Sequence, residues 1–218
     1  VQDRIRLMNV NLIAVDEAHC ISQWGNDFRP AYKNINTLRE LLPEVPCIAL
    51  TATATPTVVK DIEESLHLKD VAKCQQSFTR ENLAYTVLET ENKLLTIEKT
   101  LRKYPQSCIV YTRNRKSTVS IHESLSRKGF TSVFFHGGLS SEDKKKHLQK
   151  WLNGKVQTIV ATNAFGMGID KPDVKNVIHV QLPDSLENYY QEAGRAGRNG
   201  EYANAIILTD ANDVEILK

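Results

Sequence analysis

Two adjacent carboxylates follow a short apolar run near the start of the 218-residue chain. The run is Leu12-Ile13-Ala14-Val15, and Asp16-Glu17-Ala18-His19 comes directly after it. In open α/β sheets, ligands bind at the carboxyl ends of the strands. A carboxylate pair there suits a magnesium nucleotide, because one group holds the metal and the next orients and deprotonates water. The pair is equally compatible with ordinary polar residues that end a strand.

Two arginines near the other end of the chain have a spacing that suits phosphate binding. Arg195 and Arg198 are three residues apart, so on a helix they share one face and both reach the same phosphate group. An arginine pair beside two glycines is also typical of a solvated helix end.

An aromatic and cationic cluster follows the carboxylates by a few residues. Trp24, Phe28 and Arg29 combine flat ring faces with a guanidinium, which suits stacking on unpaired bases and holding a phosphate. A small aromatic core is the alternative. Two glycine-containing turns, residues 166–168 and 136–138, allow close approach of a backbone or a phosphate.

The composition excludes several classes of protein. Hydrophobic residues make up 41% of the chain and charged residues 25%, which is ordinary for a globular fold and excludes wholesale disorder. No apolar run approaches the roughly 18 residues of a membrane span. Residues 1–9 lack the apolar stretch of a signal peptide. We therefore expect a cytoplasmic protein that is neither secreted nor bound to a membrane.

The cysteines and the net charge indicate no special partner. Cys20, Cys47, Cys74 and Cys108 lie far apart, with no CxxC pair and no histidine at zinc-finger spacing. We expect no zinc site and four buried or half-buried thiols. The net charge of +2 is too small to indicate nucleic-acid binding by itself.

Short β-rich apolar runs alternate with amphipathic stretches, which predicts parallel sheets covered by helices. Thr55 before Pro56 predicts the start of a helix that runs through residue 66. Ser140, three residues before Asp143, predicts the start of another, which ends near Gly154. Polar residues 75–82 separate two series of these elements. The predicted strands are residues 11–15, 47–51, 83–88, 108–112, 132–135, 158–161, 177–180 and 205–208.

The motifs resemble those of a known family. Asp16-Glu17-Ala18-His19 is similar to motif II of superfamily 2 helicases, and residues 20–30 closely resemble the aromatic-rich loop of RecQ-type DNA helicases. One departure is Asn26, where many members carry histidine. The segments that resemble motifs III to VI, in the family's order, are residues 51–54, 109–115, 161–170 and 191–198.

The resemblance implies an α/β fold with two RecA-like lobes, each a parallel sheet flanked by helices, that bind ATP and Mg²⁺ between them. Residues 1–76 would form the C-terminal part of lobe one, and residues 77–218 would form lobe two, the helicase C-terminal domain. The implied function is an ATP-dependent helicase of DNA recombination and repair that moves 3′ to 5′ on single-stranded and partially duplex DNA. A bacterial member would lie at the nucleoid, and no protein partner is implied.

The resemblance also implies roles for individual residues. Glu17 would activate water and Asp16 would hold magnesium. Arg195 and Arg198 would stabilise charge on the γ-phosphate, with Arg198 the stronger candidate. The other residues assigned to ATP binding are His19, Gln23, Gly168, Asp170 and Gln191. The residues assigned to DNA binding are Trp24, Phe28, Arg29, Arg113, Asn114, His136 and Thr162.

No phosphate loop is present in the 218 residues. ATP hydrolysis in this family needs GxxxxGK[ST], and the chain's Gly154-Lys155 step is followed by Val156. We therefore expect a fragment with an incomplete first lobe, without motif I and without the zinc-binding and winged-helix region of relatives. The isolated chain should have little ATPase activity.

Two other functions stay open. One is an inert nucleic-acid-binding module, although the intact acidic and arginine motifs weigh against it. The other is an RNA helicase of the same superfamily, although the aromatic-rich loop favours DNA.

Overall fold

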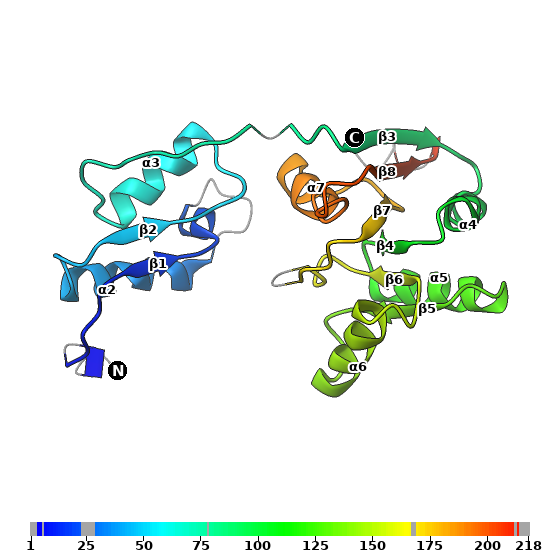
Figure 1. The fold of residues 1–218 in the computed structure, drawn as a ribbon, viewed down its shortest axis with the longest axis horizontal. Coiled ribbons are helices and arrows are strands. Elements are labelled where there is room, and N and C mark those ends of the chain that lie inside the picture. Colours follow the sequence, from blue (N-terminus) through cyan, green and yellow to red (C-terminus); the bar gives the residue numbers. More distant parts are fainter. Residues whose placement is uncertain are drawn as a thin grey trace. The chain divides into compact units, whose positions relative to one another are not determined.

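The chain forms two compact units, residues 1–78 and 79–218, each of which is described by itself (Figure 1). The computed structural model describes residues 4–5, 7–22, 29–77, 79–166, 169–211 and 213. Both units combine helices with parallel strands, so the α/β fold class expected from the sequence is confirmed.

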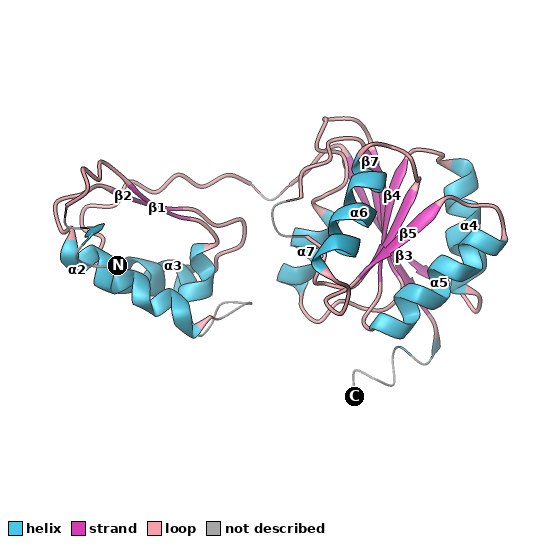
Figure 2. Ribbon diagram, turned by 90° about the horizontal axis from the view of Figure 1, so that it is seen from below, coloured by secondary structure: helices cyan, strands magenta, loops and turns pink. Residues whose placement is uncertain are grey.

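The first unit is built on two parallel strands. β1 (Ile13–Val15) pairs with β2 (Cys47–Ala49). The α-helices of residues 35–41 and 56–65 lie on the same side of these strands (Figure 2). The helical elements are the 3₁₀ helices η1 (Ala18–Ile21) and η2 (Pro30–Asn34) and the α-helices α2 (Ile35–Leu41) and α3 (Pro56–Ser65).

Only one face of this two-stranded sheet is buried among the described residues. Ile13 and Val15 of β1 pack in one cluster with Val58 and Ile62 of α3. This packing holds the end of β1, and with it the two carboxylates, against the helices. The large apolar side chains that remain exposed on the strands and beside them are Leu12, Ile48 and Leu50.

The second unit contains a parallel sheet of six strands in the order β3-β8-β7-β4-β6-β5. All of its pairings are parallel, so the carboxyl ends of the strands meet at one edge. The strands are β3 (Leu83–Glu89), β4 (Ser107–Tyr111), β5 (Ser132–Phe135), β6 (Thr158–Ala161), β7 (Val174–His179) and β8 (Ala203–Thr209).

Helices cover both faces of this sheet (Figure 2). Leu101 of α4 and Leu125 of α5 lie in the core on one face, and Trp151 of α6 and Ala193 of α7 lie in the core on the other. Buried strands with helices on both faces read as continuous apolar runs, which the sequence shows. The helices are α4 (Lys93–Lys103), α5 (Arg115–Arg127), α6 (Ser141–Leu152) and α7 (Leu186–Ala193).

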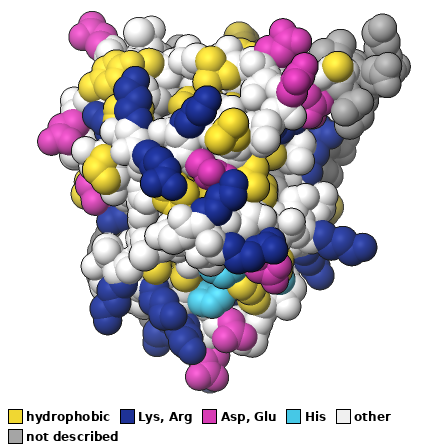
Figure 3. Space-filling model, turned by 90° about the vertical axis from the view of Figure 1, so that its right-hand side faces the viewer, with side chains coloured by type: hydrophobic (Ala, Val, Ile, Leu, Met, Phe, Trp, Pro, Cys, Tyr) yellow, Lys and Arg dark blue, Asp and Glu magenta, His cyan; other side chains and the backbone are white. Residues whose placement is uncertain are grey.

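Basic side chains gather on the face shown in Figure 3, on the side of the second unit where α4 and α5 lie. The last turns of these helices carry Arg102, Lys103 and Arg127. Cations stabilise the carboxyl end of a helix, and the Arg102 guanidinium also lies 5.0 Å from the centre of the Phe130 ring. These charges therefore have a structural explanation, and we assign them no ligand.

The local sequence signals are confirmed in the structure. Thr55 Oγ1 accepts the Val58 N–H at 3.4 Å, and Ser140 Oγ accepts the Asp143 N–H at 3.0 Å, so both predicted helix starts are present. Gly154 follows the end of α6 with a φ of 68°. All eight predicted strands form, with small differences at their ends.

Two expectations are corrected. β7 begins at Val174, three residues before the predicted start, because Asn176 is fully buried and hydrogen-bonds Asn204 of β8 at 2.8 Å. A prediction from apolar runs does not include a polar residue such as Asn176 in a buried strand. Cys74 is exposed and not buried or half-buried, since it lies in an extended polar segment after α3.

Replacing Trp151 with alanine should lower the free energy of unfolding of the second unit by about 3–5 kcal/mol. The Trp151 side chain is fully buried, and its ring centre lies 5.6 Å from that of Phe165 and 5.5 Å from the Lys171 ammonium. The substitution leaves a large cavity below the motif V segment. Urea denaturation followed by circular dichroism measures the loss. Trp151→Phe should cost less, and a loss below about 1 kcal/mol for the alanine variant would contradict this packing.

Candidate functional site

The turn after β1 presents both motif II carboxylates to solvent. Glu17 has a φ of 49°, a left-handed conformation that reverses the chain immediately after Asp16. The Glu17 N–H donates to Asp16 Oδ1 at 2.9 Å. Asp16 is exposed and Glu17 is half-buried, so both carboxylates are accessible at the carboxyl edge of the strand. This arrangement suits a metal-bound phosphate.

His19 connects this turn to the segment that follows β2. Its ring is buried, and Nδ1 lies 2.9 Å from Thr51 Oγ1 and 3.4 Å from Glu17 Oε2. The Thr51 hydroxyl donates to the Thr53 carbonyl at 3.1 Å, so its oxygen accepts from His19 Nδ1–H. One buried histidine therefore lies within reach of both Glu17 and Thr51. The sequence expectation assigned His19 to ATP binding and did not identify Thr51 as its partner.

The structure describes only the two ends of the predicted aromatic-rich loop. Gln23, Trp24 and Phe28 lie outside the described residues, as does Gly168 of motif V. Arg29 is half-buried. Its backbone N–H donates to the Cys20 carbonyl at 2.9 Å, so the two ends of the loop are hydrogen-bonded to each other.

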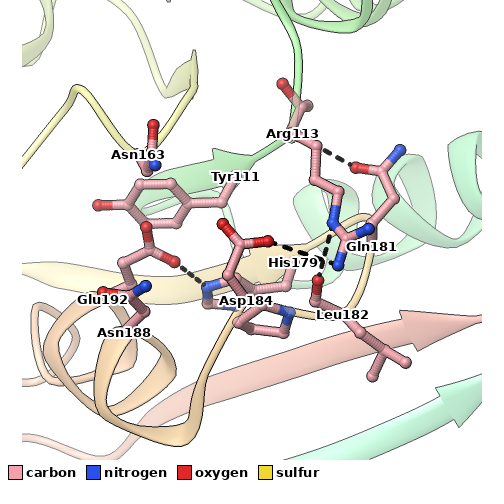
Figure 4. A pocket seen from close by; sticks show the side chains of 11 residues that line it. Tyr111, Arg113, Asn163, His179, Gln181, Leu182, Asp184, Asn188 and Glu192 are labelled. Atoms are coloured by element: carbon pink, nitrogen blue, oxygen red, sulfur yellow. Dashed lines mark hydrogen bonds and ion pairs between the residues drawn. The ribbon is translucent and has the colours of Figure 1, made fainter. Parts of the chain in front are cut away.

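A polar pocket of about 290 Å³ opens at the carboxyl edge of the second unit's sheet (Figure 4). Tyr111 and His179, the last residues of β4 and β7, line it together with Asn163, which follows β6. Asn188 and Glu192 of α7 form another part of its wall. Three parallel strands and one helix therefore converge on this pocket.

Arg113 forms one side of the pocket. The backbone N–H of Arg113 donates to Gln181 Oε1 at 3.2 Å, and its side-chain Nε donates to the Leu182 carbonyl at 3.1 Å (Figure 4). Its Nη2 lies 3.5 Å from Asp184 Oδ1, in a pair that is largely exposed. Leu182 and Asp184, which follow β7, thus orient the Arg113 guanidinium.

Tyr111, His179 and Glu192 form a buried group beside the pocket. The Tyr111 and His179 rings stack with their centres 5.2 Å apart, and His179 Nε2 lies 2.8 Å from Glu192 Oε2. Burial raises the pKa of Tyr111 well above its ordinary value, although the nearby Arg195 guanidinium lowers it in part. The hydroxyl therefore stays protonated and donates to the Phe165 carbonyl at 3.0 Å.

The two motif VI arginines both contact the motif V segment, at different points. Arg195 Nη1 donates to the Gly166 carbonyl at 2.6 Å, whereas Arg198 Nη1 donates to Asp170 Oδ1 at 3.1 Å and to the Ile169 carbonyl at 3.2 Å. Arg195 is half-buried and Arg198 is exposed. Gln191 lies on α7 ahead of both and is half-buried.

Two glycines in the motif V and motif VI segments lie in crowded places. A Cβ at Gly166 would lie 2.9 Å from Arg195 Cζ, so a side chain there would displace the guanidinium. Gly197 has a φ of 63°, and a Cβ on it would lie 2.8 Å from the Glu201 carbonyl oxygen. A left-handed conformation in so crowded a place favours glycine.

The other predicted DNA-binding residues take part in local structure. Asn114 Oδ1 accepts the Ser117 N–H at 2.8 Å and so caps α5. Thr162 is buried, and its N–H donates to the Phe135 carbonyl at 3.1 Å. His136 follows β5, and its ring stacks on Phe134 with the centres 5.6 Å apart.

Sequence reasoning missed Tyr111, His179, Asn163 and Glu192 as site residues. Tyr111 and His179 lay within two predicted strands, close to their carboxyl ends, and polar or aromatic residues at such ends are a usable signal for a site. Glu192 lay inside the motif VI segment. What could not be read was that Tyr111, His179 and Glu192 contact one another and that Asn163 lines the same pocket.

Lowering the pH below about 6.5 should destabilise the second unit in part through His122. Burial lowers the pKa of His122 and the nearby His147 lowers it further, while Glu123 raises it. The unfolded chain therefore binds a proton at a higher pH than the folded chain, and the free energy of unfolding falls as the pH drops through that interval. Urea denaturation at about pH 7.5 and at about pH 5.5 measures how much the free energy of unfolding falls between the two pH values. This fall should be smaller for His122→Gln than for the unchanged protein. Equal losses would contradict the assignment.

Among the described residues, no three or more His, Cys, Asp or Glu side chains are grouped so as to hold a metal ion. Within the same residues, no helix combines the length and the apolar character that crossing a membrane requires.

Two family models match the chain. The model of the helicase conserved C-terminal domain matches residues 91–200, half of the chain, and the model of DEAD/DEAH box helicases matches residues 1–62. The chain belongs to the helicase family. The matched helicase segments include the Asp16-Glu17-Ala18-His19 turn in the first unit, and the pocket and both arginines in the second.

Curated relatives refine this helicase assignment. The chain is 44% identical over 211 residues to the ATP-dependent DNA helicase RecQ of Bacillus subtilis, covering 96% of the chain and 36% of that protein. It is 44% identical over 205 residues to the RecQ-like DNA helicase BLM of Xenopus laevis, covering 92% of the chain and 15% of that protein. These matches confirm the resemblance to RecQ-type helicases. The chain spans about a third or less of the length of these two relatives.

Two further matches concern proteins whose names or bound molecules include RNA. A protein of Acanthamoeba polyphaga mimivirus, named as an ATP-dependent RNA helicase, is 48% identical over 209 residues, covering 95% of the chain and 38% of that protein. The solved structure of Saccharomyces cerevisiae Dbp5 bound to RNA and ADP BeF3 has a TM-score of 0.75 and 20% identity, covering 99% of the chain and 58% of that one. At this identity the structural match supports the fold alone.

Proposed function

We propose that this chain forms part of an ATP-dependent DNA helicase that moves 3′ to 5′ along single-stranded DNA and unwinds partially duplex DNA in recombination and repair. Residues 1–76 supply the motif II carboxylates, and residues 77–218 supply motifs IV to VI. The observation that carries the proposal is the carboxylate turn after β1, joined through His19 to Thr51. The proposed substrate places the protein with chromosomal DNA, at the nucleoid in a bacterium.

The carboxylate turn has the chemistry that ATP hydrolysis needs. Asp16 is an exposed oxygen donor of the kind that Mg²⁺ prefers, so the residues present fit this metal. Bound MgATP supplies the γ-phosphoryl group and neutralises part of its charge. Glu17 orients the attacking water and accepts its proton, and His19 Nδ1 lies 3.4 Å from the Glu17 carboxylate.

The motif VI arginines supply positive charge for the transition state. Arg198 is exposed, and among the described residues its guanidinium is held at Nη1 by Ile169 and Asp170, so it is the better candidate to reach a γ-phosphate. Arg195 is half-buried against the Gly166 carbonyl and acts beside it. His19, Gln23, Gly168, Asp170 and Gln191 complete the proposed ATP site.

The proposed DNA path follows residues of both units. Its aromatic and cationic members provide stacking faces and phosphate contacts, and Arg113 is the described member whose guanidinium is held at the edge of a polar pocket. The proposed DNA-binding residues are Trp24, Phe28, Arg29, Arg113, Asn114, His136 and Thr162.

An RNA substrate is the second candidate, because the mimivirus relative is named as an RNA helicase. The test uses the full-length product of the gene and measures ATP hydrolysis with single-stranded DNA, with single-stranded RNA and without nucleic acid. We expect strong stimulation by DNA, unwinding of a duplex with a 3′ DNA overhang and little turnover by the 218-residue chain alone. Stimulation by RNA only would select the RNA helicase. Nucleic-acid binding without ATP hydrolysis would select an inert binding module.

A further inference from the structure

His179 occupies a central position between two strands and the motif VI helix. It ends β7, and its cross-strand neighbour on β4 is Tyr111, which ends that strand. Its ring stacks on Tyr111 and meets the Tyr189 ring of α7 edge to face, with the centres 5.1 Å apart. Its Nε2 lies 2.8 Å from Glu192 Oε2, also on α7 (Figure 4). One side chain therefore contacts both strands' ends and the helix.

The hydrogen bond of this pair has a defined direction. A carboxylate only accepts, so His179 Nε2 carries the hydrogen that Glu192 receives. The His179 side chain is 3% exposed and that of Glu192 is 14% exposed. A buried carboxylate that loses its donor is costly, so the pair holds α7 at a set distance from the end of β7.

Tyr111 extends the contact to the motif V segment. Its hydroxyl donates to the Phe165 carbonyl at 3.0 Å, and Arg195 Nη1 donates to the next carbonyl, that of Gly166, at 2.6 Å. Two consecutive carbonyls of motif V are thus held by two side chains, one from β4 and one from the segment after α7. His179 contacts Tyr111 directly. Through Glu192 it also fixes α7, the helix that leads to Arg195.

We propose that His179 is a positioning residue for ATP hydrolysis: it sets the placement of the motif VI arginines relative to motif V through its contacts with Glu192 and Tyr111. The proposal rests on the helicase function proposed above. His179 does not touch the nucleotide. Its effect reaches the reaction through α7, which ends at Ala193, two residues before Arg195.

The consequence is a specific kinetic signature. Arginines that stabilise the transition state affect kcat more than substrate binding, so misplacing them lowers kcat and leaves the KM for ATP nearly unchanged. An error of about 1 Å in the placement of such a group costs up to about 100-fold in rate.

The test compares two replacements of His179 in the full-length gene product. His179→Phe keeps an aromatic ring beside Tyr111 but removes the donor to Glu192, whereas His179→Gln places an amide N–H close to the position of Nε2. We expect His179→Phe to lower the DNA-stimulated kcat at least about tenfold, with the KM for ATP within about threefold of the unchanged protein. His179→Gln should recover kcat to within about threefold. His122→Gln, a histidine replacement on α5 of the same unit, is the matched control and should leave kcat unchanged.

Each result decides the proposal. Thermal melts first establish that every variant is folded at the assay temperature. If folded His179→Phe keeps the kcat of the unchanged protein, or if His179→Gln is impaired as much as His179→Phe, the positioning role is wrong while the helicase function stands. If the unchanged full-length product hydrolyses no ATP with any nucleic acid, the helicase function is wrong, and this role with it.

Discussion

Replacing Glu17 with glutamine should lower the DNA-stimulated kcat for ATP hydrolysis by about 10²–10⁴-fold in the full-length gene product. Glutamine preserves the size of the side chain and its place in the left-handed turn after Asp16, but an amide cannot accept the proton of the attacking water. His19 Nδ1, 3.4 Å from Glu17 Oε2, would then face an amide in place of a carboxylate. Steady-state ATP hydrolysis at saturating single-stranded DNA measures the effect.

Binding separates this role from a general loss of structure. The affinity for a fluorescent ATP analogue should stay within about threefold in Glu17→Gln, because Asp16 remains to hold magnesium. Glu64→Gln is the matched control, since Glu64 is an exposed residue of α3 that pairs only with Lys60 among the described contacts. A kcat within about tenfold of the unchanged protein would exclude Glu17 as the general base.

Arg198→Ala should lower kcat by about 10³–10⁵-fold, the effect of removing an arginine that stabilises a transferring phosphoryl group. The residue is exposed, and in the part of the chain that the structure describes its guanidinium is held through Nη1, by Asp170 Oδ1 at 3.1 Å and the Ile169 carbonyl at 3.2 Å. Loss of the exposed Arg198–Asp170 ion pair should change the free energy of unfolding little. Arg198→Ala should therefore lower kcat without lowering the melting temperature. Parallel kinetic and melting measurements distinguish the two effects.

Lysine at the same position tests the geometry of the contact. Arg198→Lys keeps the charge but loses the planar fork of donors, so it should recover only a minor part of the lost rate. Arg127→Ala is the control, because Arg127 is an exposed arginine at the end of α5 that contacts Glu123 and Ser124 of its own helix. Full activity of Arg198→Ala would transfer the proposed role to Arg195, whose guanidinium holds the Gly166 carbonyl.

Within each unit the structure places single side chains between motifs. In the first unit His19 lies between the carboxylate turn and Thr51. In the second unit His179 lies between the end of β4 and the motif VI helix. Both histidines are buried, and each is within hydrogen-bond or ion-pair distance of a glutamate. Each histidine thereby contacts motifs that lie far apart in the sequence.

The sequence by itself determined the elements and the motifs they carry. All eight strands, the α3 start at Thr55 and the α6 start at Ser140 were readable, because apolar runs, caps and turn residues act over a few neighbouring positions. The Asp16-Glu17-Ala18-His19 turn at the end of β1 was readable for the same reason. The family followed from the order of such short segments.

Only the tertiary structure decided which side chains meet. The early start of β7 depends on a buried amide pair between Asn176 and Asn204, and the His179 group depends on a strand order in which β4 lies beside β7. These contacts join residues many positions apart, so no local pattern encodes them. They form because the parallel sheet brings the ends of separate strands to one edge and the packed helices bring their polar groups within hydrogen-bonding distance.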